Sequence, residues 1–295
     1  MNRVNENDSW VRGPDGAPGF TASYITGCWK RCSYCFAMEL ANGRLKSRYL
    51  ANDHCAPGFN AGPRREFSLD DPFWPRAWPK VLNDIEKRQK PTGIFLNIMG
   101  EWAHEQIPVF WKKDMLDCIK GCPQHVFYLL TKQYDQLPVY AFPDNCLVGA
   151  SVTDSADLAT ACYYLAKTRA RIKFLSIEPL LGMIIGSTLD QMLLVDAGIK
   201  WVIVGAATGT SKMLRQVAKE HPELVSMEYN GRRTAQPPAR WVTDIIKMAK
   251  AVGARVFLKN NLYPGLSSMD AMDLNDRPYW IGPGDGYELR QEAWK

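Results

Sequence analysis

The most informative stretch of the sequence is Gly27-Cys28-Trp29-Lys30-Arg31-Cys32-Ser33-Tyr34-Cys35-Phe36-Ala37. Its cysteines follow the spacing Cys-x3-Cys-x2-Cys, which converges three thiolates within a short loop. Thiolates are soft ligands that suit iron–sulfur clusters and zinc. An ordinary iron–sulfur cluster takes four cysteines, so a cluster held by three would leave one iron open to a further ligand. The alternative is a closed structural zinc site, with His54 or Cys55 as the fourth ligand.

The composition is that of an ordinary soluble globular protein, with 46% hydrophobic and 23% charged residues in a chain of 295. The segment Met1–Trp10 lacks the basic and then apolar order of a signal peptide. No apolar run approaches the roughly 20 residues that cross a bilayer. We therefore expect a cytoplasmic protein whose eight cysteines are metal ligands or free thiols rather than disulfides. The net charge of +5 permits an anionic substrate without requiring one.

Short apolar runs alternate with stretches of helical periodicity, as is typical of βα units around a parallel sheet. The expected strands are Phe20–Thr26, Gly93–Met99, His125–Thr131, Cys146–Val152, Ile172–Ile177, Trp201–Gly205 and Arg255–Lys259. The expected helices are Phe36–Tyr49, Pro79–Lys90, Val109–Lys120, Ser155–Lys167, Leu189–Ala197, Met213–Lys219 and Ala239–Val252. Continuous apolar strands fit a sheet buried on both faces. The sequence therefore predicts an α/β fold with parallel strands, a partial to near-complete (β/α) TIM-like barrel.

Most of the expected strands end in a polar or glycine-bearing turn. The turns are Met99-Gly100-Glu101, Thr131-Lys132, Ser151-Val152-Thr153, Ser176-Ile177-Glu178, Gly205-Ala206-Ala207-Thr208-Gly209 and Lys259-Asn260-Asn261. Parallel α/β folds bind ligands at the carboxyl ends of their strands, so this pattern predicts a site there. Helix capping and turn formation explain Ser151, Thr153 and the glycines equally well. They explain Glu101, Glu178 and Lys259 less well, because charged residues directly after apolar strands are usually paired or functional.

The cysteine loop lies between the first expected strand and the first expected helix, with an aromatic residue before its last cysteine. In these features it is similar to the signature of the radical S-adenosylmethionine (SAM) enzymes. Further segments resemble a phage-associated and bacterial group of that superfamily, related to spore photoproduct lyase. They span residues 21–261 and include Leu130-Thr131-Lys132, Phe174-Leu175-Ser176-Ile177-Glu178-Pro179-Leu180-Leu181-Gly182 and Val256-Phe257-Leu258-Lys259.

The resemblance implies a [4Fe–4S] cluster bound by Cys28, Cys32 and Cys35, with SAM on the open iron. An electron from a donor such as flavodoxin or ferredoxin would cleave SAM to a 5′-deoxyadenosyl radical, which abstracts a hydrogen atom from the substrate. The kinship favours a nucleotide or nucleic acid as substrate, with a peptide or small metabolite as the alternative. A zinc-stabilised nucleic-acid-binding protein without catalysis is the hypothesis from a different class.

The resemblance also assigns SAM-binding residues. Met99-Gly100-Glu101 is similar to the Gly-Gly-Glu turn that holds the SAM amino group, with Gly100 allowing close approach and Glu101 accepting from the ammonium. A surface ion pair is the alternative for this glutamate. Tyr34 is expected to pack near the adenine or the cluster. The remaining expected contacts are Ser151 and Thr153 with the ribose or carboxylate, and Gly205 and Ala206 with the adenine.

Glu178 and Lys259 are the expected catalytic residues, facing the substrate or the SAM carboxylate or pairing with each other. His104 is a further catalytic candidate, although an isolated histidine is more often structural. The five other cysteines have no assigned role: Cys55, Cys118, Cys122, Cys146 and Cys162.

Basic residues offer a second line of argument on the substrate. Arg64, Arg65, Arg169, Arg171, Arg232, Arg233 and Arg240 could hold phosphates, or be solvated charges with acidic neighbours. For domain organisation, we expect one barrel domain over residues 1–261 with a loop insertion at about 50–78. A tail, residues 262–295, could cover the barrel mouth as a lid.

Overall fold

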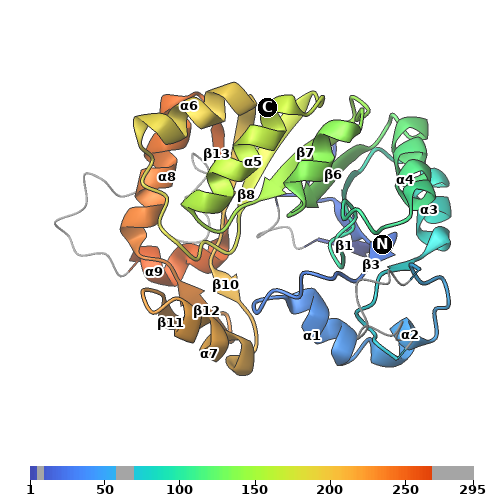
Figure 1. Cartoon of the computed structure of the whole chain (residues 1–295), viewed down its shortest axis with the longest axis horizontal. Helices are drawn as coiled ribbons and strands as arrows, with labels where there is room; N and C mark the ends of the chain where they lie inside the picture. The colour runs from blue at the N-terminus through green and yellow to red at the C-terminus, as the bar shows by residue number, and fades with distance from the viewer. Residues whose placement is uncertain (5–9, 58–69, 268–295) are drawn as a thin grey trace.

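The strands assemble into a central, mostly parallel sheet, as the computed structural model shows for residues 1–4, 10–57 and 70–267 (Figure 1). Its order is β1-β2-β5-β6-β7-β8-β9-β13, and only β1 (Asn2–Arg3) pairs antiparallel. The parallel strands are β2 (Phe20–Ala22), β5 (Gly93–Leu96), β6 (Val126–Thr131), β7 (Cys146–Ser151), β8 (Ile172–Ile177), β9 (Ile199–Val204) and β13 (Arg255–Leu258). Within the described residues β1 does not pair with β13, so the sheet is open and a complete barrel is not formed.

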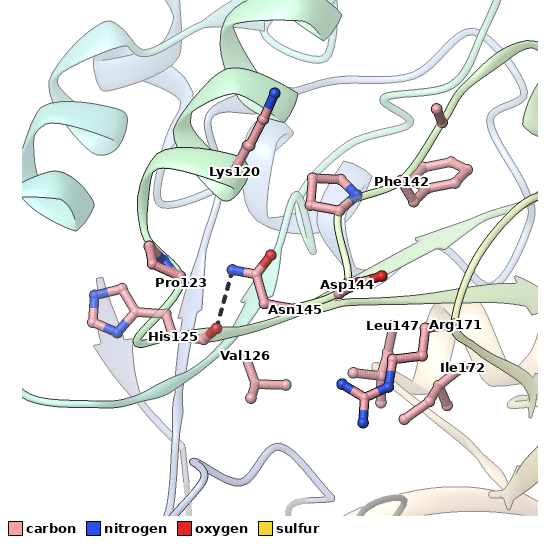
Figure 2. Close-up of a pocket in the computed structure, with 12 residues that line it drawn as sticks. Lys120, Pro123, His125, Val126, Phe142, Asp144, Asn145, Leu147, Arg171 and Ile172 are labelled. Carbon is pink, nitrogen blue, oxygen red and sulfur yellow. Dashed lines mark hydrogen bonds between the residues drawn. The ribbon is translucent and has the colours of Figure 1, made fainter.

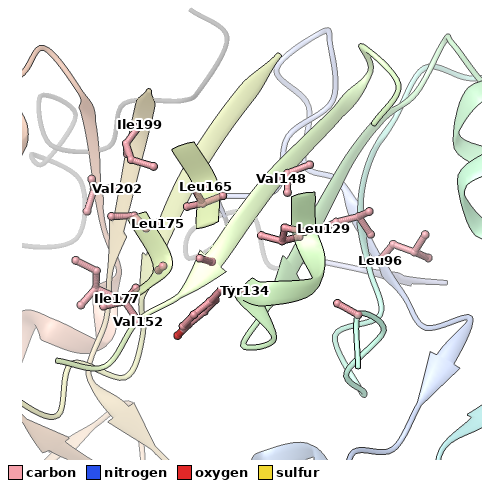
Figure 3. Packing of buried hydrophobic residues seen from close by; sticks show 14 of the residues in the cluster. Leu96, Leu129, Tyr134, Val148, Val152, Leu165, Leu175, Ile177, Ile199 and Val202 are labelled. Carbon is pink, nitrogen blue, oxygen red and sulfur yellow. The ribbon is translucent and has the colours of Figure 1, made fainter. Parts of the chain in front are cut away.

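Helices cover one face of this sheet. They are α3 (Pro79–Glu86), α4 (Val109–Gly121), α5 (Ser155–Lys167), α6 (Thr188–Ala197) and α8 (Ala239–Ala251). Their apolar sides meet the sheet in one buried cluster, in which Leu129, Val148, Leu175 and Val202 follow one another across neighbouring strands (Figure 3). None of the helices in the described ranges is both long and apolar enough to cross a membrane.

An aromatic cluster fills the opposite, concave face of the sheet. It contains Tyr128, Phe174, Trp201 and Phe257, together with Trp10 from the segment before β2. The ring centroid of Trp10 lies 5.3 Å from Tyr128, 5.8 Å from Phe174 and 5.7 Å from Trp201. Side chains alternate between the two faces along a strand. The concave face therefore has an aromatic floor toward the amino ends of the strands.

The strand register places polar residues above this floor. One row across the sheet contains Gly149, Phe174 and Trp201, and the next contains Ser151, Ser176 and Ile203. By the same alternation, Glu178, Gly205 and Lys259 follow two residues beyond Ser176, Ile203 and Phe257 at the strand ends. The concave face is therefore aromatic toward the amino ends of the strands and polar at their carboxyl ends.

Two expected elements are broken in the structure. The expected strand Phe20–Thr26 is split into β2 and β3 (Ile25–Thr26). At this point Asn97 adopts a φ of 66° and its side chain accepts from the Ile25 N–H at 2.8 Å. The expected helix Phe36–Tyr49 is also two helices, α1 (Phe36–Asn42) and α2 (Lys46–Leu50), because the chain turns out of the helix at Gly43. Local periodicity does not report such breaks.

A second, three-stranded sheet was not expected from the sequence. Its order is β10 (Ala207–Thr208), β12 (Arg232–Gln236) and β11 (Val225–Tyr229), and α7 (Ser211–Glu220) connects β10 to β11. The β11–β12 hairpin turns at Asn230-Gly231, where both residues have positive φ. The dipeptide Asn-Gly between two strand-forming stretches is a strong signal for a hairpin, so this hairpin could have been predicted from the sequence.

The other described elements connect or terminate these layers. They are β4 (Arg76–Ala77), which pairs with β3, the 3-10 helices Tyr134–Val139 and Asn260–Leu262, and α9 (Tyr263–Ser267). Part of the expected loop insertion, residues 58–69, and most of the expected tail, residues 268–295, lie outside the described residues. The domain boundaries stay a prediction.

We expect Gly149→Ala to lower the free energy of unfolding by about 1–3 kcal/mol through overpacking. A Cβ atom at this position would lie 2.4 Å from the buried ring of Phe174. Gly121→Ala is the matched control, because the space beside this exposed helical glycine is open. Urea unfolding followed by tryptophan fluorescence measures both variants. Equal stability of the two variants would contradict the described packing of the concave face.

Candidate active site

The first half of the cysteine loop is held by two neighbouring loops. Gly27 pairs with Gly100, and the Cys28 N–H donates to the Phe73 carbonyl at 3.2 Å. The Trp29 ring contacts Trp74 at a centroid distance of 5.6 Å. Arg31 has a φ of 48° and forms an ion pair with Asp71. A side chain in this left-handed region is strained, and such residues cluster at functional sites.

The second half of the loop leads into α1. The Cys35 N–H donates to the Cys32 carbonyl at 3.1 Å, and the Cys35 thiol caps α1 by accepting from the Met38 N–H at 3.4 Å. Tyr34, between these cysteines, packs half-buried against the apolar core of α7 and the three-stranded sheet. Local hydrogen bonds therefore orient Cys35, while Tyr34 connects the loop to a distant part of the chain.

The thiols lie close enough together to influence one another. Burial raises the pKa of Cys28 to about 11, with Glu101 as the next cause and Cys35 contributing. Burial also raises the pKa of Cys35, and the neighbouring Cys32 adds to that rise. Both groups are thus neutral thiols near neutral pH in the absence of a cation, and a metal that binds them must displace protons.

The three loop cysteines are free thiols, and each is half-buried. No group of three or more His, Cys, Asp or Glu side chains among the described residues is arranged to hold one metal ion. A closed zinc site needs four ligands around one point, and neither His54 nor Cys55 completes such a group with the loop. A four-iron cluster is wider, since its thiolates bind different irons. Three free thiols on one loop match the number of ligands that a four-iron cluster with one open iron would need.

Glu101 lies beside the loop in the turn after β5. Its buried carboxylate accepts from the Thr131 hydroxyl at 2.5 Å, the Lys132 N–H at 2.9 Å and the Ala103 N–H at 3.1 Å. Burial raises the pKa of Glu101, and these hydrogen bonds oppose the rise. An exposed surface ion pair, the alternative from the sequence, therefore does not describe this side chain.

Gly100 has a clear packing role. A Cβ atom here would lie 2.7 Å from the backbone of Thr26, so only glycine allows the β5 turn to approach the cysteine loop this closely. The expected reason, approach to a ligand, is not needed to explain the residue. The close approach is between two parts of the chain.

Lys132 is a central residue of the site that sequence reasoning did not single out. It follows β6, is half-buried, and its ammonium donates to the Ser151 hydroxyl and lies 5.4 Å from the centroid of the Tyr34 ring. Burial lowers the pKa of Lys132, whereas Cys32 and the neighbouring carboxylates raise it. The sequence did offer a signal for Lys132: it is a charged residue directly after an apolar strand, and the same rule selected Glu101.

The two expected polar residues after β7 have different partners. Ser151 contacts Lys132, and the Tyr134 hydroxyl donates to the Ser151 carbonyl. Thr153 donates its hydroxyl to Asp157 at 2.7 Å, and its N–H also reaches that carboxylate, at 3.1 Å. The Thr153 contacts are local to the start of α5. Of the two side chains, Ser151 is the one joined to the residues around the cysteine loop.

Glu178 and Lys259 form an ion pair across the strand ends. The strand between them, β9, is followed by Gly205, where a Cβ atom would lie 3.0 Å from the Glu178 carboxyl carbon. Any side chain at that position would thus press on the glutamate. Both charged side chains remain partly exposed, at 25% for Glu178 and 20% for Lys259.

The backbone of Ala206 is held by an asparagine that the sequence analysis did not select. Asn261 accepts from the Ala206 N–H at 3.2 Å and donates to its carbonyl at 2.8 Å. Asn261 also donates to the Thr208 hydroxyl at 3.1 Å. Sequence alone did not identify Asn261, because its partner lies 55 residues away.

His104 contacts the cysteine loop rather than the strand-end residues. Its ring lies 4.7 Å from the Trp29 ring, and its Nδ1 accepts from the Gln106 N–H at 3.1 Å. Burial lowers the pKa of His104. The buried Lys112 ammonium donates to the His104 carbonyl at 2.7 Å. These contacts give the histidine a structural role in the turn after β5.

The other five cysteines differ in burial. Cys118, Cys122, Cys146 and Cys162 are buried, and Cys55 is half-buried. Burial raises the pKa of Cys146, at the start of β7. Cys118 on α4 and Cys122, which follows its last residue, lie close enough to interact, and burial raises the pKa of both. The four buried cysteines behave as small apolar side chains of the core.

The basic residues lie on different surfaces. Arg232 and Arg233 are exposed on β12, and Arg240 forms an ion pair with Asp244 at 3.6 Å. Arg171 lines a pocket at the amino ends of β6, β7 and β8, the opposite edge from the cysteine loop (Figure 2). Arg64 and Arg65 lie outside the described residues.

Comparison with known proteins supports the fold. A spore photoproduct lyase mutant has a TM-score of 0.50 at 10% identity, over 88% of this chain and 81% of that one. The same enzyme with bound AdoMet and dinucleoside spore photoproduct has a TM-score of 0.49 at 12% identity, covering 82% and 76%. The fold is thus similar to that of spore photoproduct lyase, a radical SAM enzyme.

Sequence comparison gives a family but no characterised relative. No curated protein matches the chain. One family model matches residues 20–224, which include the cysteine loop, every parallel strand but β13, and α7. By this match the chain belongs to the DUF5131 family, described as proteins of unknown function.

Proposed function

We propose that this protein is a radical SAM enzyme in which Cys28, Cys32 and Cys35 bind a [4Fe–4S] cluster. The observation that carries the proposal is the place of the cysteine loop, at the carboxyl edge of a mostly parallel sheet with Glu101 and Lys132 beside its thiols. The similarity to the spore photoproduct lyase fold supports it. When bound, cluster and SAM supply a 5′-deoxyadenosyl radical, which can remove a hydrogen atom that no side-chain base can reach.

The residues around the loop suit the polar groups of SAM. A carboxylate accepts about four hydrogen bonds, and Glu101 accepts three from the protein, so it can take one more from an ammonium. Lys132 and Ser151 together offer a charge and a hydroxyl for the carboxylate. Thr153 stays a weaker candidate, because Asp157 already binds its hydroxyl.

Adenine binding is assigned to the small residues Gly205 and Ala206. Because Asn261 already binds the N–H and the carbonyl of Ala206, we expect the base to stack there rather than form hydrogen bonds to that backbone. Tyr34 is the candidate for a second aromatic contact near the cluster.

Glu178 and Lys259 are proposed to face the substrate. As an ion pair they carry no net charge, so they suit a polar neutral group better than a second anion. His104 remains a catalytic candidate of lower rank, since its ring already packs on Trp29. The electron would come from a donor such as flavodoxin or ferredoxin.

A nucleotide or nucleic acid is the proposed substrate. The exposed Arg232 and Arg233 on β12 offer contacts for phosphates, in addition to the sequence kinship. A peptide or a small metabolite is the alternative within the same reaction class. A non-catalytic, zinc-stabilised nucleic-acid-binding protein is the hypothesis from a different class, and the similarity to the spore photoproduct lyase fold favours the enzyme over it.

Reconstitution tests the reaction directly. We expect protein loaded anaerobically with iron and sulfide to form 5′-deoxyadenosine from SAM and dithionite, as measured by chromatography. Cys32→Ala should abolish the product, because a cluster ligand is lost. His54→Ala with Cys55→Ala is the control, since it removes both candidate fourth zinc ligands and leaves the three cluster ligands in place. Bound zinc without 5′-deoxyadenosine would reject the enzyme proposal.

The Lys132–Ser151 assignment has its own prediction. Lys132→Met should raise the Kd for SAM roughly tenfold, because a half-buried charge-assisted hydrogen bond is removed. Lys30→Met removes an exposed charge from the same region and should change the Kd less than twofold. Equilibrium dialysis with labelled SAM measures both. Equal effects of the two substitutions would refute the assignment.

Binding to nucleic acid tests the substrate class. Arg232→Glu with Arg233→Glu should weaken binding of a fluorescent single-stranded DNA oligonucleotide and reduce its salt slope by about two. Lys200→Glu with Lys250→Glu reverses two exposed charges on other elements and serves as the control. Fluorescence anisotropy at several salt concentrations gives the slopes. An unchanged slope in the arginine variant would count against a nucleic-acid substrate.

A further inference from the structure

The three-stranded sheet and α7 form a small unit with its own apolar core, which we name the α7 module (residues 207–236). Its core includes Ala207, Met213, Leu214, Val217 and Ala235. Figure 1 shows the module beside α1 and the loop that precedes it, although the two are far apart in sequence. The fold alone does not explain why this unit lies against the cysteine loop.

Both ends of α7 contact the second half of the loop and α1. At the carboxyl end, the Ser33 hydroxyl donates to Glu220 at 2.6 Å. At the amino end, the Thr210 hydroxyl donates to Glu39 and also accepts from the Met213 N–H at 3.3 Å. Between these ends, Tyr34 packs on the module core. Three separate contacts thus join the segment from Ser33 to Glu39 to the α7 module.

The charges at the helix ends indicate that these contacts are specific. Glu39 lies at the positive amino end of α7, where a carboxylate is favourable. Glu220 lies at the negative carboxyl end, where a carboxylate is unfavourable. Hydrogen bonds from Gln216 and Ser33 nevertheless hold the pKa of Glu220 below its usual range. An acidic residue at this end of a helix is explained by its contact with the loop.

The two halves of the cysteine loop therefore have different supports. Cys28 is held by backbone contacts to residues near Phe73 and Met99, which do not involve the module. Cys32 and Cys35 flank Ser33 and Tyr34; Ser33 donates to Glu220 of the module, and Tyr34 packs on the module core and also lies beside the Lys132 ammonium. Movement of the module would disturb Ser33 and Tyr34 directly, and with them the two thiols on either side, whereas the backbone contacts of Cys28 do not involve it.

We propose that the α7 module is a clamp that positions Cys32 and Cys35, with Thr210 and Glu220 as its positioning residues. The proposal rests on the proposed function, because it takes these thiols as cluster ligands. It assigns to the module a task in site assembly, in addition to the contact that Lys132 after β6 makes with Tyr34.

Cysteine alkylation in the metal-free protein tests the clamp without any cluster. In the double variant Thr210→Ala with Glu220→Ala, we expect iodoacetamide to modify Cys32 and Cys35 about five- to tenfold faster, while Cys28 is unchanged. Mass spectrometry of the peptides gives the three rates. Unchanged rates, or an equal rise at all three cysteines, would overturn the proposal.

Two controls make the result specific. Glu223→Ala removes another exposed carboxylate shortly after α7 and should leave all rates unchanged. Thr210→Ser with Glu220→Gln keeps a hydroxyl for Glu39 and an acceptor for the Ser33 hydroxyl, and should restore rates close to those of the unmodified chain. Failure of this conservative variant to restore them would show that the hydrogen bond is not the cause.

Iron release provides the second readout. We expect the reconstituted double variant to lose iron to a chelator several-fold faster than the unmodified protein or the Glu223→Ala variant. Equal rates would overturn the positioning role. Failure of the unmodified protein to bind iron would reject the proposed function instead, and the alkylation rates would still decide the clamp.

Discussion

The close approach of two glycine-bearing segments is the contact on which the site depends. Gly27 and Gly100 pair directly, and a side chain at Gly100 would collide with the backbone of Thr26. This contact joins the cysteine loop to the turn after β5. It therefore brings the Cys28 thiol to the Glu101 carboxylate, which accepts hydrogen bonds from Thr131 at the end of β6 and from Lys132 after it. One backbone contact thus connects the loop after β3, the turn after β5 and the end of β6.

The concave face explains why polar residues gather at that edge. Aromatic rings around Trp10 fill the part of this face toward the amino ends of the strands. Above this floor, the same strands present Ser151, Glu178 and Lys259 at the carboxyl edge. Alternation along each strand separates these side chains from the core under the helices. The aromatic side chains of the core and the polar side chains proposed for binding therefore lie in different rows of one sheet.

Much of this arrangement was predictable from local sequence. Continuous apolar runs located β8 and α5 at their observed ends, and charged residues after strands indicated Glu101, Glu178 and Lys259. Contacts between residues far apart in the sequence were not predictable, because hydrophobic periodicity indicates which side chains are buried and not which residues they contact. Asn97, which splits the first strand, and Asn261, which binds Ala206, act through such contacts. Lys132 is a different case, since the rule that selected Glu101 also applied to it.

The central claim is that the cysteine loop holds a cluster with one iron open to SAM. Electron paramagnetic resonance of the dithionite-reduced, reconstituted protein tests it most directly, because the spectrum reports both the cluster and its ligands. We expect a [4Fe–4S]+ signal whose g values shift when SAM is added and which is lost in Cys35→Ala. A cluster signal unaffected by SAM, or no cluster signal after reconstitution, would contradict the account.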